Sequence, residues 1–76
     1  MPCLNADGTL TESALKLLEL LERPHTPQEV ASRLDRPLYW VRLSLREMVG
    51  ADLVRTEGER YIATEKGLTK RQETLL

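Results

Sequence analysis

The apolar positions between residues 26 and 54 recur at helical spacing, and the rest of the chain is organised around this stretch. A first stripe holds Val30, Ala31 and Leu34, and a second stripe holds Leu38, Val41, Leu45, Met48 and Val49. Pro37 separates the stripes, because proline lacks a backbone donor and disfavours helical geometry in the residue before it. The pattern therefore predicts a helix-turn-helix over residues 26–50, with helices that end near Leu34 and Val49.

The first of these two helices carries clear signals at both ends. Thr26 is a favourable N-cap, Pro27 suits the first helical position, and Glu29 lies at capping-box spacing from Thr26. Asp35, in the turn, tolerates a left-handed backbone better than most residues, although less well than glycine. We therefore expect a short helix that is capped by Thr26 and ends at a tight turn.

A further helix is expected before this unit. Residues 11–23 are predicted to be helical up to Pro24, with Thr9 or Thr11 as the N-cap and an inner stripe of Ala14, Leu17, Leu18 and Leu21. Leu20 lies off this stripe and is expected to be a lone exposed leucine. Residues 1–9 are expected to be a loose N-terminus with a turn at Asp7-Gly8.

A β-hairpin is expected after the helix-turn-helix. Its strands are predicted at residues 53–56 and 60–63, around a turn at Glu57-Gly58-Glu59. Thr64 then caps a last helical segment over residues 65–76. The chain is thus predicted to be one small domain of the α+β class, mainly α.

This sequence resembles the winged helix-turn-helix of MarR- and ArsR-type transcription regulators. The run T-x-x-E-L-A-x-x-L-G-x-S-x-x-x-V-x-x-x-L-x-x-L-x-x-x-G-L-V is typical of them, and its places are matched by Thr26, Glu29, Val30, Ala31, Leu34, Val41, Leu45, Met48, Leu53 and Val54. Residues 60–67 (RYIATEKG) are similar to the Y-x-L-T-x-K-G that closes the wing. The resemblance covers most of residues 11–68, although Asp35 stands where the family has glycine. It implies a three-helix core, a hairpin wing at residues 53–64 and a short C-terminal helix.

The distribution of charge is more informative than the net charge of −1. Residues 33–46 contain one acid, Asp35, and four bases: Arg33, Arg36, Arg42 and Arg46. A local patch of this kind can bind phosphate although the whole chain is near neutral. Positive charge is therefore concentrated on residues 33–46 of the helix-turn-helix and on the last segment, where Lys66, Lys70 and Arg71 stand against Glu73.

The outer face of helix 38–50 is the candidate binding surface. Tyr39, Leu43 and Arg46 point away from its apolar stripe, and Arg42 and Trp40 flank them. The resemblance implies that this face enters the major groove of double-stranded DNA, where Arg can read guanine, Leu can meet a thymine methyl and Tyr can contact phosphate. The expected DNA-binding residues are Arg36, Tyr39, Trp40, Arg42, Leu43 and Arg46, with Arg55 and Arg60 beside the wing turn.

Two features favour an alternative function. The helix begins with Pro37-Leu38-Tyr39-Trp40, where a DNA-reading helix often begins with small polar residues, and the wing tip carries Glu57 and Glu59, which phosphate repels. An exposed cluster of Tyr39, Trp40 and Leu43 is also typical of a protein-binding surface. The alternative is therefore a winged-helix protein-interaction module. Two interpretations that involve no binding function also stay open. In one of them Trp40 belongs to the core, and in the other Arg42 and Arg46 form a solvated face with local pairs to Glu47.

The sequence gives little support to other functions. Cys3 is the only cysteine and His25 the only histidine, so neither a disulfide within the chain nor a metal site is expected. No glycine-rich phosphate loop or catalytic pair occurs, and no enzyme activity or cofactor is expected. No apolar run reaches about 18 residues and no signal peptide is found, so we expect a cytoplasmic protein without a membrane segment.

Self-association is expected to be weak. The resemblance implies a dimer that reads two half-sites of a palindrome. The apolar residues outside the predicted core are few, namely Leu20, Leu68, Leu75 and Leu76. These supply only part of the area, about 1,200–2,000 Å², that a stable interface buries. We therefore expect a concentration-dependent homodimer through helix 11–23 and residues 65–76.

Overall fold

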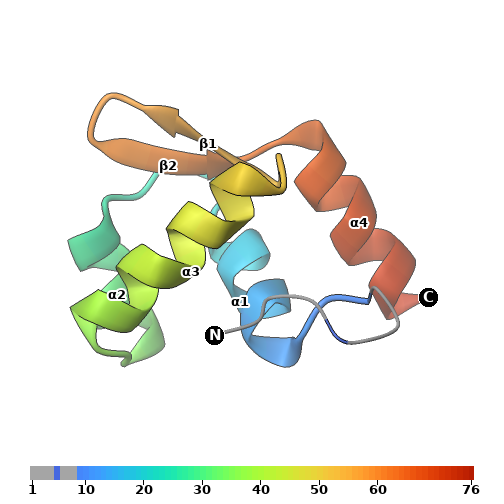
Figure 1. The fold of residues 1–76 in the computed structure, drawn as a ribbon, viewed down its shortest axis with the longest axis horizontal. Coiled ribbons are helices and arrows are strands. Elements are labelled where there is room, and N and C mark those ends of the chain that lie inside the picture. The colour runs from blue at the N-terminus through green and yellow to red at the C-terminus, as the bar shows by residue number, and fades with distance from the viewer. Residues whose placement is uncertain (1–4, 6–8) are drawn as a thin grey trace.

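The computed structural model describes Asn5 and residues 9–76, so Cys3 and the turn expected at Asp7-Gly8 lie outside the described residues. The elements in the described part are α1 (Glu12–Leu20), α2 (Pro27–Leu34), α3 (Leu38–Gly50), β1 (Val54–Glu57), β2 (Arg60–Ala63) and α4 (Glu65–Leu75) (Figure 1). The predicted class, α+β and mainly helical, is confirmed by these four helices and the two-stranded antiparallel hairpin. The arrangement is compatible with a winged helix.

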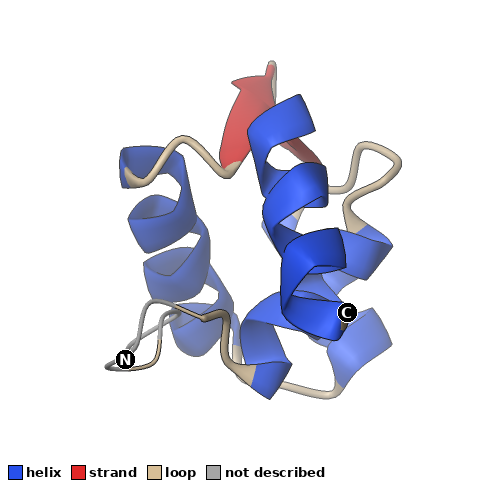
Figure 2. Ribbon diagram, turned by 90° about the vertical axis from the view of Figure 1, so that its right-hand side faces the viewer, coloured by secondary structure: helices blue, strands red, loops and turns tan. Residues whose placement is uncertain are grey.

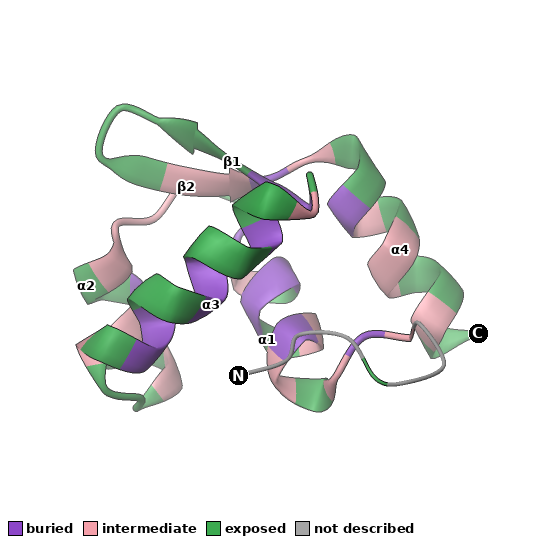
Figure 3. Ribbon diagram, viewed as in Figure 1, coloured by how far each residue is buried: buried purple, intermediate pink, exposed green. Residues whose placement is uncertain are grey.

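The helices enclose one apolar core beneath the hairpin. α2 packs on α3, and α4 packs on α1. The hairpin lies at one end of the helical part in both ribbon views (Figure 1 and Figure 2). The inner faces of α1 and α3 are buried and the outer face of α3 is exposed (Figure 3). The buried apolar residues are Leu10, Ala14, Leu17, Leu18, Leu21, Val30, Trp40, Val41, Leu45, Met48, Leu53, Val54 and Ala63.

Side-chain caps fix the starts of the first two helices. In the capping box of α2, the Thr26 N–H donates to Glu29 Oε1 at 2.8 Å and the Glu29 N–H donates to Thr26 Oγ1 at 3.2 Å, as predicted. Thr11 is the cap of α1, because its Oγ1 accepts from the Ala14 N–H at 3.2 Å. α1 ends at Leu20 rather than near residue 23. Proline at position 24 disfavours helical geometry at the residue before it, which helps to explain this early end.

Two aspartates allow the chain to turn at the ends of α2 and α3. Asp35 has φ 53° and ψ 50°, so the left-handed turn expected there is present without glycine. The Arg36 N–H then donates to the Ala31 carbonyl oxygen at 3.1 Å and closes the end of α2. Asp52, which the pattern of the sequence did not single out, has φ 63°. Asp is among the few residues other than glycine that adopt this conformation.

The hairpin is tighter than predicted. Val54 pairs with Ala63 and Glu57 pairs with Arg60, so the loop consists of Gly58 and Glu59 alone and Glu57 belongs to β1. Gly58 has φ 63°, as a two-residue hairpin loop requires. The backbone of His25 pairs with that of Tyr61 through hydrogen bonds of 3.0 and 2.8 Å. The connector between α1 and α2 is thereby fastened to the outer edge of β2.

Thr64 joins the hairpin to α4. Its Oγ1 accepts from the Gly67 N–H at 3.0 Å and donates to the Asp52 carbonyl oxygen at 2.7 Å, and its N–H donates to the Leu53 carbonyl oxygen at 3.0 Å. Gly67 is buried so closely that a Cβ there would collide with the Leu53 carbonyl oxygen and touch the Leu18 side chain. Residues 65–76, which were expected to take part in a homodimer, therefore pack on α1 and close one side of the core of their own chain.

Three apolar residues lie differently from the prediction. Val49 was placed on the core stripe of α3 but is 38% exposed, whereas Trp40 was placed on a flank but is only 6% exposed. Leu20 is partly buried against the core rather than exposed. The reason on α3 is that the small polar residue Ser44 is itself buried, which shifts the core-facing arc toward Trp40 and away from Val49. No helix in the described residues is long and apolar enough to span a bilayer.

Candidate nucleic-acid interface

The exposed face of α3 carries a continuous stripe of four side chains. Tyr39, Arg42, Leu43 and Arg46 are all exposed, and their spacing of three and four residues places them on one side of the helix. Tyr39 is 70% exposed and Leu43 is 54% exposed, although both are large and apolar in part. Burial of the opposite face holds this stripe outward. We call these four residues the α3 stripe.

The α3 stripe forms one wall of a groove. The start of α2 contributes Thr26, Pro27 and Gln28, and the hairpin contributes Gly58, Glu59 and Tyr61. Three elements that are separate in the sequence therefore meet around one surface. The pairing of His25 with Tyr61 explains this meeting, because it holds the start of α2 beside the hairpin.

Strand alternation separates Tyr61 from the two arginines of the hairpin. Thr56 and Tyr61 are directly opposite each other and share a face. Arg55 and Arg60 are each displaced by one residue from this pair and so lie on the other face of the hairpin. Arg55 also donates to Glu57 at 2.9 Å, which offsets its charge. The structure thus brings neither Arg55 nor Arg60 to the face that Tyr61 shares with the α3 stripe.

Trp40 and Arg36 form a separate pair. Trp40 packs in the core, and the Arg36 guanidinium lies over its ring, 5.1 Å from the ring centroid. The alternative that Trp40 packs in the core is therefore confirmed, and the exposed cluster expected on this face consists of Tyr39 and Leu43 without Trp40. Of the eight residues expected to bind DNA, the structure assembles the four of the α3 stripe in one groove.

The arginines of the α3 stripe place two positive charges on the helix side of the groove. Elsewhere on the surface, ion pairs join Lys16 with Glu12, Arg55 with Glu57 and Arg71 with Glu19. Within the groove, the one acidic side chain among the lining residues described is Glu59. The groove is therefore positive on the helix side and acidic at the tip of the hairpin.

A capping carboxylate reduces the positive potential at the start of α2. The hydrogen bond from the Thr26 backbone N–H lowers the pKa of Glu29 below its ordinary value of 4.5, and the positive charge of Arg60 acts in the same direction. Glu29 is therefore ionised at neutral pH and offsets the partial positive charge of the helix end. The positive charge around this groove therefore comes mainly from the side chains of α3.

Other chemistry has little support in the described residues. No group of three or more His, Cys, Asp or Glu side chains that could hold a metal ion occurs among them.

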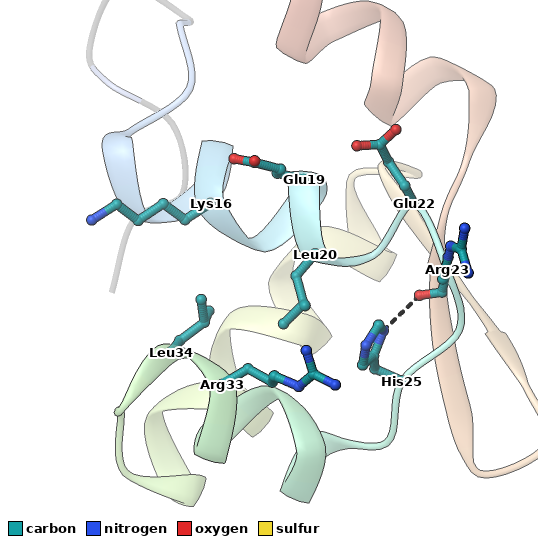
Figure 4. A pocket seen from close by; sticks show the side chains of 8 residues that line it. All are labelled: Lys16, Glu19, Leu20, Glu22, Arg23, His25, Arg33 and Leu34. Atoms are coloured by element: carbon teal, nitrogen blue, oxygen red, sulfur yellow. Dashed lines mark hydrogen bonds between the residues drawn. The ribbon is translucent and has the colours of Figure 1, made fainter.

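A second hollow lies between α1 and α2 and is lined by Lys16, Glu19, Leu20, Glu22, Arg23, His25, Arg33 and Leu34 (Figure 4). His25 Nδ1 donates to the Arg23 carbonyl oxygen at 2.7 Å in this hollow, which holds the imidazole in the connector.

Comparison with models of known protein families found no family that matches the chain, and comparison with curated proteins found no matching relative.

Proposed function

We propose that this chain is a winged helix-turn-helix protein of the MarR and ArsR kind that binds double-stranded DNA through the α3 stripe and acts in transcription regulation. The observation that carries the proposal is the groove itself. Arg42 and Arg46, both exposed, lie in it with Tyr39 and Leu43, between the start of α2 and the hairpin. The major groove is wide enough to admit an α-helix, and arginines on the exposed face of that helix can reach the base edges.

Each residue of the α3 stripe has a distinct role in this proposal. Arg42 and Arg46 donate paired hydrogen bonds to guanine edges or to phosphates. Tyr39 donates its hydroxyl hydrogen to a phosphate oxygen, and Leu43 contacts a thymine methyl group. The hairpin contributes less than is usual for a wing, because Glu57 and Glu59 repel phosphate and Arg55 is paired with Glu57. The acidic tip therefore restricts contact with DNA to the side of α3.

A salt series of binding to random-sequence duplex DNA tests the class of partner. Binding through phosphate contacts releases counterions, so the logarithm of the affinity is expected to fall linearly with the logarithm of salt concentration. Binding that is absent even at low salt contradicts the proposal. The same measurement with a selected duplex gives the ratio of specific to non-specific affinity, which a regulator needs.

Substitution of the two arginines tests the surface. Arg42→Ala and Arg46→Ala are each expected to weaken DNA binding by about 1–3 kcal/mol, if the side chain meets a base or a phosphate from which water is excluded. Arg33→Ala is the matched control, because Arg33 is exposed on α2 but does not line the groove. If both variants bind DNA as tightly as the parent, the α3 stripe is not the DNA-binding surface.

A protein-interaction module is the second candidate function. The exposed side chains of Tyr39 and Leu43 favour it, since large apolar groups in the centre of a surface often anchor a protein partner. The acidic tip of the hairpin favours it as well. In that case Tyr39→Ala and Leu43→Ala would abolish binding to the partner, and the chain would show no salt-dependent affinity for duplex DNA.

A further inference from the structure

A small cavity lies outside the groove, where α1 meets the turn between α2 and α3. Its volume is about 60 Å³, and its lining residues are Ser13, Lys16, Leu34, Arg36 and Trp40. None of these residues lines the groove of the α3 stripe. A cavity of this size has room for about two water molecules or one small polyatomic group.

The side chains around the cavity are mainly hydrogen-bond donors. The Lys16 ammonium, the Arg36 guanidinium and the Trp40 indole N–H donate and do not accept, and the Ser13 hydroxyl can do either. The fifth lining residue, Leu34, is apolar, so no carboxylate lines the cavity. Because Arg36 lies over the face of the Trp40 ring, the N–H groups at the edge of its guanidinium are not used by this contact.

The indole nitrogen of Trp40 lacks a partner. Trp40 is more than nine-tenths buried, and its Nε1 is a buried donor without a hydrogen-bond acceptor. Buried donors are almost always paired in folded proteins, because leaving one unpaired is destabilising. A water molecule would accept from Nε1 but would need acceptors for its own hydrogens, of which the lining side chains offer only the Ser13 hydroxyl. An anion has only acceptors and suits this lining better.

We propose that this cavity binds a small carboxylate. One carboxylate oxygen accepts from the Trp40 Nε1–H, and the other accepts from Arg36 and Lys16. The Arg36 guanidinium is suited to a carboxylate because its parallel N–H groups match the two oxygens. The site, with a volume of about 60 Å³, is too small for a phosphodiester that continues in both directions along a duplex. The proposal therefore concerns a free ligand and is independent of DNA binding.

The two cations can reorganise around the ligand at little cost. Lys16 Nζ lies 3.7 Å from Glu12 Oε1, but both side chains are largely exposed, and such pairs contribute little to stability. Arg36 is also exposed. Trp40 Nε1 has less than 1 Å² of accessible surface. In this proposal a ligand reaches it when these two exposed side chains move.

The single tryptophan of the chain provides a direct test. Its indole N–H gives one resonance in a proton–nitrogen correlation spectrum. Sodium acetate is titrated into the protein at constant ionic strength, with sodium chloride as the replaced salt. We expect a saturable downfield shift of the indole proton, because a new hydrogen bond to a carboxylate deshields it. A shift that is linear in acetate, or equal in chloride alone, overturns the proposal.

Variants of the two cations locate the binding. Arg36→Gln is expected to raise the acetate dissociation constant at least tenfold, and Lys16→Gln is expected to raise it several-fold. Arg33→Gln and Lys66→Gln remove the same charges from exposed positions outside the cavity and should leave the constant unchanged. All four side chains are exposed, so the fold should tolerate each change. Equal weakening by all four variants would show a general charge effect and would overturn the site.

Discussion

At the scale of single residues, two glycines of this chain face opposite constraints. Gly67 is buried at the start of α4, where a Cβ would meet the backbone carbonyl of Leu53. Gly50 ends α3 with open space around it, and its φ is not in the left-handed region. Gly67 is therefore required by packing, whereas nothing in the structure requires glycine at position 50.

Substitution by alanine should separate these two cases. Gly67→Ala is expected to destabilise the protein by about 1–3 kcal/mol, because the obstructing atom belongs to the backbone and cannot move aside cheaply. Gly50→Ala is expected to stabilise it by about 0.4–1 kcal/mol, because alanine restricts the unfolded chain and favours helix. Thermal melting of both variants against the parent checks this. Two shifts of the same sign would contradict the packing assigned to α4.

The sequence could not reveal several of these residue-scale features. Gly67 and Leu53 are fourteen positions apart in the sequence. The requirement for glycine at position 67 arises only because the fold brings α4 against the Leu53 carbonyl. The same holds for Asp52, whose left-handed φ becomes visible only where α3 meets β1. By contrast, the capping box of α2 is a local feature, and Thr26 and Glu29 alone were enough to predict it.

At the scale of elements, α3 has two faces with sharply different burial. Val41, Leu45 and Met48 are buried, as predicted, while Leu43 is exposed on the other side. The flank position predicted for Trp40 was wrong, and the alternative that it packs in the core holds, because the buried Ser44 lies within the core-facing arc and is not apolar. A search for apolar residues at helical spacing does not place a small polar residue such as Ser44 in the core, although Ser44 is buried. The candidate site was consequently predicted in part, with the α3 stripe correct in its exposure and Trp40 misplaced.

A pair of leucines on α3 tests this assignment. Leu45→Ala is expected to destabilise the protein by about 2–5 kcal/mol, because it leaves a cavity in the core. Leu43→Ala, the same chemical change on the exposed face, should alter stability by less than about 0.5 kcal/mol. Chemical denaturation of both variants measures the difference. A Leu45→Ala variant as stable as the parent would mean that the core face of α3 is misassigned.

The capping box of α2 makes a prediction about pH. Because the hydrogen bond from Thr26 lowers the pKa of Glu29 in the folded state, its contribution to stability is fully present above the ordinary pKa of 4.5. That contribution is lost as the pH falls through the lower pKa of the folded state. The difference in melting temperature between the parent and Glu29→Gln should therefore shrink on acidification from neutral pH.

The matched control for this series is Glu22→Gln, which removes one exposed carboxylate that caps no helix. A difference between the parent and Glu29→Gln that stays constant with pH would show that the carboxylate charge has no part in the cap. Thermal melts at closely spaced pH values, recorded at fixed ionic strength, distinguish the two results.

At the scale of the whole molecule, the arrangement of α4 changes the expected mode of self-association. Leu68 and Leu20 both pack against the core of their own chain, and Leu20 also lines the hollow between α1 and α2 (Figure 4). The four leucines expected to form a dimer surface are therefore not all available. Only Leu75 and Leu76, which are 58% and 97% exposed, remain open. The helical pattern of residues 65–76 was predicted, but its docking on α1 depends on the tertiary fold.

We predict that the chain is a monomer at micromolar concentrations and associates only toward millimolar concentrations. Two leucines at the end of one helix supply little of the 1,200–2,000 Å² or so that a stable interface buries. Lys66 and Lys70 on the same helix would also repel their counterparts if a two-fold axis passed through it. Sedimentation equilibrium over this concentration range measures the mass. The double variant Leu75→Ser and Leu76→Ser, which spares the core, should abolish any association seen at high concentration. A dimer that persists at micromolar concentrations, or that survives this double substitution, would require a different surface. The α3 stripe, where Tyr39 and Leu43 are exposed, would then be the candidate interface.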